Sequence, residues 1–297
     1  MSKIRLLIVS VLAAVATLAT PVAGQETARN DRPIIDMHMH ALPADFRGGE
    51  PSAAADEALL RETLLVMDEY SIVKAFLSGP LEHVFRWTEA APGRFIPSLM
   101  FGREGFPDLE ALRAHYVAGR LAAMGEITSQ YAGIPPNAVV LEPYFALAEE
   151  LDLPVLIHTG GTGAPRPTFR ISAGHPLLLE DVLVRHPQLR LFVEGGGYPF
   201  VDEMIALMHR YPGVHADLSL VTRRPLAAFH DYLQRFMRAG FGKRVMFGSD
   251  QGLRPETIPG AIEAIETADF LTEDEKRDIF CNNAARFLRL DAVVCRQ

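Results

Sequence analysis

Histidine and aspartate side chains follow short apolar runs at three places in this 297-residue sequence. His38 and His40, two positions apart, come at the carboxyl end of the first run, His158 ends Pro-Val-Leu-Ile-His, and Asp250 ends Val-Met-Phe-Gly-Ser-Asp. Because the carboxyl ends of parallel strands meet at one rim, we expect these four side chains to converge there. Three imidazoles and a carboxylate suit Zn²⁺, with Mn²⁺, Fe²⁺ or Co²⁺ as alternatives.

The His-x-His spacing also predicts the direction of the two imidazoles. Successive side chains of a strand point to opposite faces, so His38 and His40 would share the inward face of a barrel. Ile35, Met37 and Met39 would then face the surrounding helices. An isolated pair of this kind could be two ordinary strand residues, but four candidates at matching strand ends favour a shared site, since buried polar groups without partners are costly.

The elements that position these residues alternate between two kinds. Eight apolar, β-branched runs read as strands: Ile34–His38, Ile72–Leu77, Arg94–Met100, Leu121–Glu126, Val155–His158, Leu189–Glu194, Val214–Leu218 and Val245–Phe247. Between them lie segments whose apolar residues recur three and four positions apart, as expected for amphipathic helices. Eight such units predict an α/β fold, a closed (β/α)8 TIM barrel, formed as a single catalytic domain by residues 25–297.

Residues 1–24 have the pattern of a secretory signal peptide. Lys3 and Arg5 accompany an apolar run that ends in the small residues Val22-Ala23-Gly24. A permanent membrane anchor is the less favoured reading, because threonines and Pro21 interrupt the run. We therefore expect a secreted or periplasmic protein with no stable membrane anchor after cleavage.

Charge and cysteine content narrow the classes of partner. The formal net charge is −8 at pH 7, and an acidic chain without a basic cluster is a poor nucleic-acid binder. The expected partner is a small-molecule substrate, and a homo-oligomer is compatible with the sequence. Cys281 and Cys295 could form a disulfide in an oxidising compartment or remain two free thiols, because sequence does not fix the distance between them.

Five motifs in chain order resemble one family. They are Asp36-x-His38-x-His40-x-x-Pro43, Pro154 to Gly160, the Gly195-Gly-Gly-Tyr-Pro199 run, Phe247-Gly-Ser-Asp250 and Asn283 to Leu288. Together they resemble the amidohydrolase superfamily, and within it the branch containing aminocarboxymuconate-semialdehyde decarboxylase. The resemblance implies one or two divalent metals held by His38, His40, His158 and Asp250. It also implies a strand-four ligand, for which the candidate here is Glu126.

One position departs from the family pattern. The family usually has a histidine before the glycine run of strand six, whereas this chain has Glu194. A carboxylate can ligate a metal or accept a proton from water, but it is not a cationic acid at ordinary pH. The departure weakens a decarboxylase assignment.

Arginines in the loops after the strands are candidates for binding a substrate carboxylate. They are Arg47, Arg103, Arg166, Arg170, Arg223 and Arg254. Arg170, in the loop between Gly160 and Gly174, and Arg254, just after Asp250, are the two foremost candidates. His175 could face the same mouth, although its position before a proline favours a role in starting a helix.

These residues lead to three functional hypotheses. The first is a metal-dependent hydrolase, in which Asp250 or Glu194 takes a proton from metal-activated water that attacks an ester, lactone or amide carbonyl. The second is a nonoxidative, metal-dependent decarboxylase of a small unsaturated or aromatic acid. The third is a noncatalytic secreted binding protein that retains metal ligands.

Overall fold

A computed structural model describes residues 32–161, 163, 166–219, 222 and 224–296. In this part of the chain eight parallel strands follow one another around a ring in the order β1 to β8. Their bounds are β1 Ile34–His40, β2 Ile72–Gly79, β3 Phe95–Phe101, β4 Ala123–Ile127, β5 Pro154–Ile157, β6 Arg190–Val193, β7 Val214–Asp217 and β8 Val245–Met246. Backbone hydrogen bonds close the ring between its first and last segments, from Met37 N to Phe247 O at 2.9 Å and from Asp250 N to His38 O at 2.8 Å.

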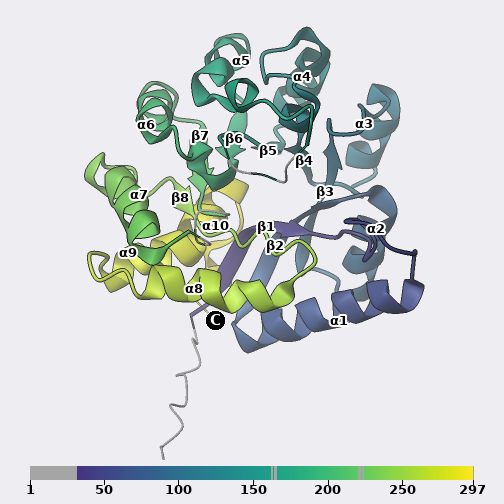
Figure 1. Cartoon of the computed structure of the whole chain (residues 1–297), viewed down its shortest axis with the longest axis horizontal. Helices are drawn as coiled ribbons and strands as arrows, with labels where there is room; N and C mark the ends of the chain where they lie inside the picture. Colours follow the sequence, from purple (N-terminus) through teal and green to yellow (C-terminus); the bar gives the residue numbers. More distant parts are fainter. Residues whose placement is uncertain (1–31, 162, 164–165, 220–221, 223, 297) are drawn as a thin grey trace, which may run out of the picture.

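Helices surround these strands, as Figure 1 shows. They are α1 Ala53–Glu69, α2 Leu81–Ala90, α3 Leu109–Val117, α4 Glu142–Glu150, α5 Glu180–Arg185, α6 Val201–Arg210, α7 Leu226–Arg238, α8 Ile258–Glu266, α9 Glu273–Arg277 and α10 Asn283–Leu288. The longer helices pair an apolar stripe with a polar face, and burial of this stripe against the strands holds them around the barrel. The predicted TIM barrel is confirmed, and the eight expected strands lie within two residues of the observed ones.

The barrel interior is filled by apolar side chains from opposite strands. Phe76 on β2 and Phe192 on β6 meet with ring centroids 5.1 Å apart, which is only feasible across the barrel axis. Ile35 and Met37 belong to this interior cluster, whereas Met39 packs in the outer one. The expectation that all three face the helices is therefore wrong for Ile35 and Met37. The β1–β2 register shifts twice along β1, and such irregularities break the alternation of side chains.

The last segment of the chain closes the end of the barrel opposite the histidine pair. Phe287 on α10 packs edge-on against Phe192 of the interior, with ring centroids 5.4 Å apart. A disulfide joins Cys281 to Cys295, whose Cα atoms are 5.8 Å apart. This answers the question that the sequence left open and ties the C-terminal η9 turn, Ala292–Cys295, to the segment before α10.

The predicted signal peptide, residues 1–24, lies outside the described residues. Among the helices that are described, none combines the length and apolar character needed to cross a bilayer.

Candidate active site and metal centre

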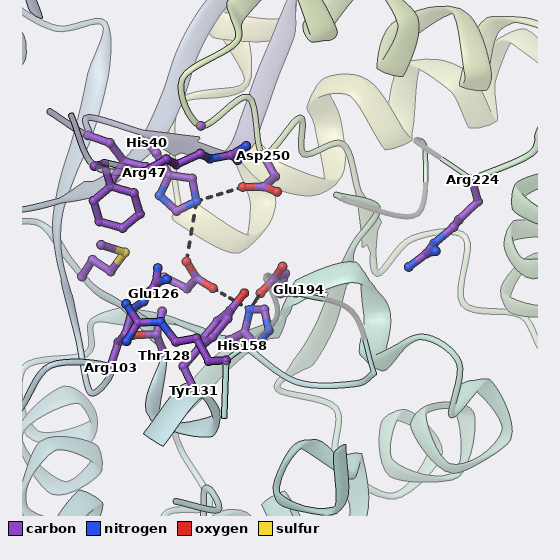
Figure 2. A pocket seen from close by; sticks show the side chains of 16 residues that line it. His40, Arg47, Arg103, Glu126, Thr128, Tyr131, His158, Glu194, Arg224 and Asp250 are labelled. Atoms are coloured by element: carbon purple, nitrogen blue, oxygen red, sulfur yellow. Dashed lines mark hydrogen bonds and ion pairs between the residues drawn. The ribbon is translucent and has the colours of Figure 1, made fainter. Parts of the chain in front are cut away.

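A cavity of about 690 Å³ opens at the carboxyl ends of the strands. Side chains and backbone from the loops after most strands line it: His40, Leu42, Phe46, Arg47, Met100, Arg103, Glu126, Thr128, Tyr131, His158, Gly163, Arg166, Glu194, Arg224, Asp250 and Gly252. Figure 2 shows His40, Glu126 and Asp250 close together, with His158 and Glu194 on the other side of Glu126. Such a cavity, with acidic and imidazole groups at one wall, is the usual location of an active site in this fold.

The two imidazoles of β1 face each other inside the barrel. Their Nε2 atoms are 3.1 Å apart. His38 Nδ1 lies 3.2 Å from Asp217 Oδ2 and 2.9 Å from Ser219 Oγ, while His40 Nδ1 lies 3.3 Å from the Ser78 carbonyl oxygen. Donation from both Nδ1 atoms leaves a lone pair on each Nε2. Two lone pairs at this separation repel each other unless a proton or a metal cation lies between them, so this pair fits a metal ion.

Asp250 completes the first group of ligands. Its Oδ1 is 3.0 Å from His40 Nε2 and 4.0 Å from His38 Nε2. Its backbone has φ +46°, an uncommon region that aspartate tolerates better than most residues, and its N–H donates to His38 O at 2.8 Å. Ligand atoms of His38, His40 and Asp250 all lie within 4.8 Å of one another. These three side chains could therefore share one ion.

Glu126 connects this group to a second one. Its Oε2 is 3.7 Å from His38 Nε2 and 3.6 Å from His40 Nε2, while its Oε1 is 2.8 Å from His158 Nδ1. His158 Nδ1 also contacts the Glu194 carboxylate. His38, Glu126 and Glu194 form a second set with ligand atoms within 4.8 Å. Glu126 thus lies where one carboxylate could serve two metal positions.

Burial sets the electrostatics of this wall. Burial and the nearby Glu126 charge raise the pKa of Glu194 well above its usual range, despite the opposing charge of His158. Burial also opposes ionisation of Glu126, but hydrogen bonds from His158 and His38 prevail and hold its pKa well below the usual range. Burial likewise disfavours a cationic His38, yet hydrogen bonds to Asp217 and Glu126 raise its pKa. These buried acidic groups favour positive charge at this wall of the cavity, and a divalent cation would supply it.

The glycine run after β6 explains how Glu194 reaches the cavity. Gly195 and Gly196 have φ of +51° and +53°. A Cβ on Gly196 would come within 2.1 Å of the Tyr232 hydroxyl oxygen, so only glycine fits. Gly195 N–H donates to Asp217 Oδ1 at 3.0 Å, and Tyr232 OH donates to Gly195 O at 2.7 Å. These bonds fix the backbone directly beside Glu194.

The predicted ligands and bases lie together in this structure. His38, His40, Glu126, His158, Glu194 and Asp250 form one continuous group of side chains. Sequence reasoning missed Asp217 and Ser219, which contact the back of His38. The signal for Asp217 was its place at the end of the seventh apolar run.

The two foremost arginine candidates are not among the residues that line the cavity. Arg170 Nη1 donates to Pro167 O and Phe169 O in its own loop, at 2.8 and 3.0 Å, and the Arg254 side chain is exposed. Their predicted role in binding substrate is not supported by these positions. Arg47, Arg103 and Arg166 from the wider set do line the cavity, and Arg224 joins them without having been predicted. Arg223 lies outside the described residues.

His175 has the helix-start role that the sequence favoured. Its Nδ1 accepts a hydrogen bond from Leu177 N at 3.4 Å, at the start of the η4 turn, Pro176–Leu179.

Comparison with solved structures agrees with this architecture. An uncharacterized TIM-barrel protein from Bordetella bronchiseptica matches with a TM-score of 0.67 and 19% identity, over 86% of this chain and 98% of that one. A probable 2-pyrone-4,6-dicarboxylic acid hydrolase from Acinetobacter baumannii, with citric acid bound, matches with a TM-score of 0.65 and 15% identity, over 86% and 99%. A dihydroxybenzoic acid decarboxylase from Polaromonas sp. JS666, with bound manganese and the inhibitor 2-nitroresorcinol, matches with a TM-score of 0.63 and 13% identity, over 89% and 99%. At these identities the likeness shows the fold.

Sequence comparison places the chain more specifically. None of the curated proteins matches it. The family model for amidohydrolases matches residues 35–290, which include every candidate ligand. Together with the grouped imidazoles and carboxylates, this match shows an enzyme that depends on a divalent metal. The chain belongs to the amidohydrolase family.

Proposed function

We propose that this protein is a metal-dependent hydrolase that uses an activated water molecule on a carbonyl carbon of a small ester, lactone or amide. The observation that carries this proposal is the position of Asp250. One carboxylate oxygen lies against the imidazole pair, and the side chain is 17% exposed to the cavity. A base in that position can take a proton from water held beside the metal ligands.

We propose Zn²⁺ as the metal, because imidazole and carboxylate ligands suit it, with Mn²⁺, Fe²⁺ and Co²⁺ as alternatives. A bound divalent ion would lower the pKa of a water molecule at its open position and polarise the substrate carbonyl. His38, His40 and Asp250 would hold it, with Glu126 and His158 as further ligands. Asp217 and the Ser78 carbonyl orient the two imidazoles from behind.

Two carboxylates of the chain are candidates for the proton transfers of the reaction. Asp250 takes the proton of the attacking water and returns it to the leaving group. Glu194 lines the same cavity beside His158 and is the second candidate base. His158 is held by Glu126, so its orientation is fixed before substrate enters.

A decarboxylase is the second candidate function. Its support is the set of four arginines lining the cavity, which could hold a substrate carboxylate, together with decarboxylases among the similar structures. Position 194 carries no histidine, so the proton donor to carbon would have to be the Glu194 carboxyl group, whose raised pKa favours its protonated form. Release of CO₂ from a panel of aromatic and unsaturated acids, without cleavage of their esters, would favour this candidate over hydrolysis.

The disulfide supports a further proposal, that the protein is exported after removal of residues 1–24. Disulfides persist in oxidising compartments and are rare in the cytosol. Fractionation of cells producing the full chain, with N-terminal sequencing of the mature protein, tests it. A product that retains residues 1–24 in the cytosolic fraction contradicts it.

The first prediction concerns Asp250→Asn. This variant keeps an oxygen near His40 but loses the base, so we expect a loss of about 10²-fold or more in kcat for ester, lactone or amide hydrolysis. Elemental analysis should still find metal, and circular dichroism should show an unchanged fold. Asp269→Asn, at an exposed position, is the matched control and should keep full activity. Undiminished hydrolysis by Asp250→Asn would end this assignment.

A further inference from the structure

The loop after β3 carries an arginine into the cavity on a tight turn. Gly102 has φ +101°, and a Cβ there would lie 2.8 Å from Ser129 N. Its N–H donates to Gly105 O at 2.7 Å, which closes the turn. The backbone before Arg103 therefore packs closely against the segment after β4, and this contact fixes the position of the Arg103 backbone at the rim. An arginine on such a base loses little freedom when it binds a ligand.

Aromatic rings hold the guanidinium group in place. Its Cζ is 5.0 Å from the centroid of the Phe46 ring and 4.8 Å from that of Tyr131. These rings come from the loops after β1 and β4, so three loops contribute to the position of one cation. Only 16% of the Arg103 side chain is exposed. In Figure 2 it lies beside Tyr131 and Thr128, on the side of the cavity near Glu126, whereas Arg224 lies far across from it.

This held guanidinium has an unused donor. Its Nε is buried and has no hydrogen-bond partner among the described residues. The Glu104 carboxylate oxygen, at 3.8 Å, is too distant for a hydrogen bond. A buried donor without a partner is costly, and an anion in the cavity that draws the guanidinium group towards itself would provide one.

The surrounding charges favour an anionic ligand. Arg166 also lines the cavity and pairs with Glu104, Nη2 to Oε1, at 2.8 Å. Burial, and next the Arg166 charge, lower the pKa of Arg103, because two cations close together disfavour each other. The Glu104 carboxylate near both groups offsets part of this repulsion, and an anionic ligand would offset more of it. Arg103 lies on the side of the cavity near Glu126, so an anion bound to it would be held beside the candidate metal ligands.

We propose that Arg103 determines specificity by binding a carboxylate of the substrate other than the group that reacts. The substrate class is then a small acid that carries a hydrolysable carbonyl and a separate carboxylate. A guanidinium edge with two parallel N–H groups matches the planar carboxylate geometrically. This proposal rests on the proposed function only for the identity of the reacting group.

Binding of simple diacids tests Arg103 without any turnover. Isophthalate and glutarate are titrated calorimetrically into metal-loaded protein, each against its monoamide, which lacks one carboxylate. We expect the diacid to bind about 10- to 100-fold more tightly than its monoamide, the range for a hydrogen bond to a charged group. In Arg103→Gln this ratio should fall to about 1. A wild-type protein without diacid preference, or a preference that survives in Arg103→Gln, would overturn the proposal.

Two further variants separate the guanidinium from charge and folding. Arg103→Lys keeps the charge but loses the paired donors and ring contacts, so it should recover only part of the preference. Arg61→Gln removes an exposed arginine of α1 and should bind as the wild type does. Equal preference in Arg103→Lys and wild type would show that charge alone acts and would contradict the assignment. Diacid binding without hydrolysis of any monoester would refute the proposed function and leave Arg103 as the carboxylate site.

Discussion

At the scale of single residues, Asp217 links two parts of the candidate metal centre that are far apart in sequence. Its Oδ2 contacts His38 Nδ1 at 3.2 Å, while its Oδ1 accepts from Gly195 N at 3.0 Å and Ser219 N at 2.8 Å. The side chain is fully buried. One carboxylate thus orients an imidazole from β1 and fixes the backbone next to Glu194 after β6.

We therefore predict that Asp217→Asn weakens metal binding. The amide can offer only one acceptor, and its NH₂ group would face either His38 or two backbone N–H donors. Loss of such an outer partner typically lowers metal affinity about 10- to 100-fold. Competition against a chromophoric chelator measures this for Zn²⁺ and Mn²⁺, with Asp269→Asn as control. Equal affinities of Asp217→Asn and wild type would show that this carboxylate does not support the ligands.

At the scale of elements, the strands were predictable because their signal is local. An apolar, β-branched run followed by a polar residue specifies both the strand and its rim, so His158 and Asp250 could be placed from sequence. The loops were not predictable in the same way. Arg103 reaches the cavity because Gly102 packs against Ser129, a contact between loops that no local pattern encodes. Arg170 turns back onto its own loop for the same kind of reason.

The disulfide gives a prediction about the last element. It closes a loop of 14 residues between Cys281 and Cys295. Chain-entropy arguments assign about 3 kcal/mol to a loop of about 15 residues. We expect the double variant Cys281→Ala, Cys295→Ser to lose about that much free energy of unfolding, measured by urea denaturation. Adding reductant should shift the wild type to the variant's midpoint and leave the variant unchanged; a reductant-insensitive wild type would contradict a stabilising bridge.

At the scale of the whole molecule, the two ends of the barrel have opposite character. One rim gathers the imidazoles, carboxylates and arginines around the cavity, while the other end is closed by α10 through Phe287. The sequence predicted this polarity, since the chemistry-bearing residues all followed their strands. It did not predict that Ile35 and Met37 fill the interior, because the register shifts of β1 depend on its pairing with β2.

His215 lies near the closed end and connects stability to pH. Its ring packs against Phe287, with centroids 4.6 Å apart, and Nδ1 has no hydrogen-bond partner among the described residues. Burial, reinforced by the charges of Arg244 and Arg286, lowers the pKa of His215 from 6.5 to about 4. Between pH 6.5 and about 4, His215 is protonated in the unfolded chain but stays neutral in the folded protein. The unfolded state therefore binds more protons, and the free energy of unfolding falls as the pH drops through this range.

We predict that His215→Leu flattens this dependence. A shift of one pKa unit corresponds to about 1.4 kcal/mol of unfolding free energy. Because the ring is partly exposed, solvent screening reduces the full contribution of His215 to about 2 kcal/mol. Urea unfolding of chelator-treated protein at about pH 7 and about pH 4 gives the loss for each protein, and chelation removes any contribution from metal release. The wild type should lose about 2 kcal/mol more than the variant over that range. Parallel losses would mean that His215 titrates alike in both states and that its burial does not exclude the proton.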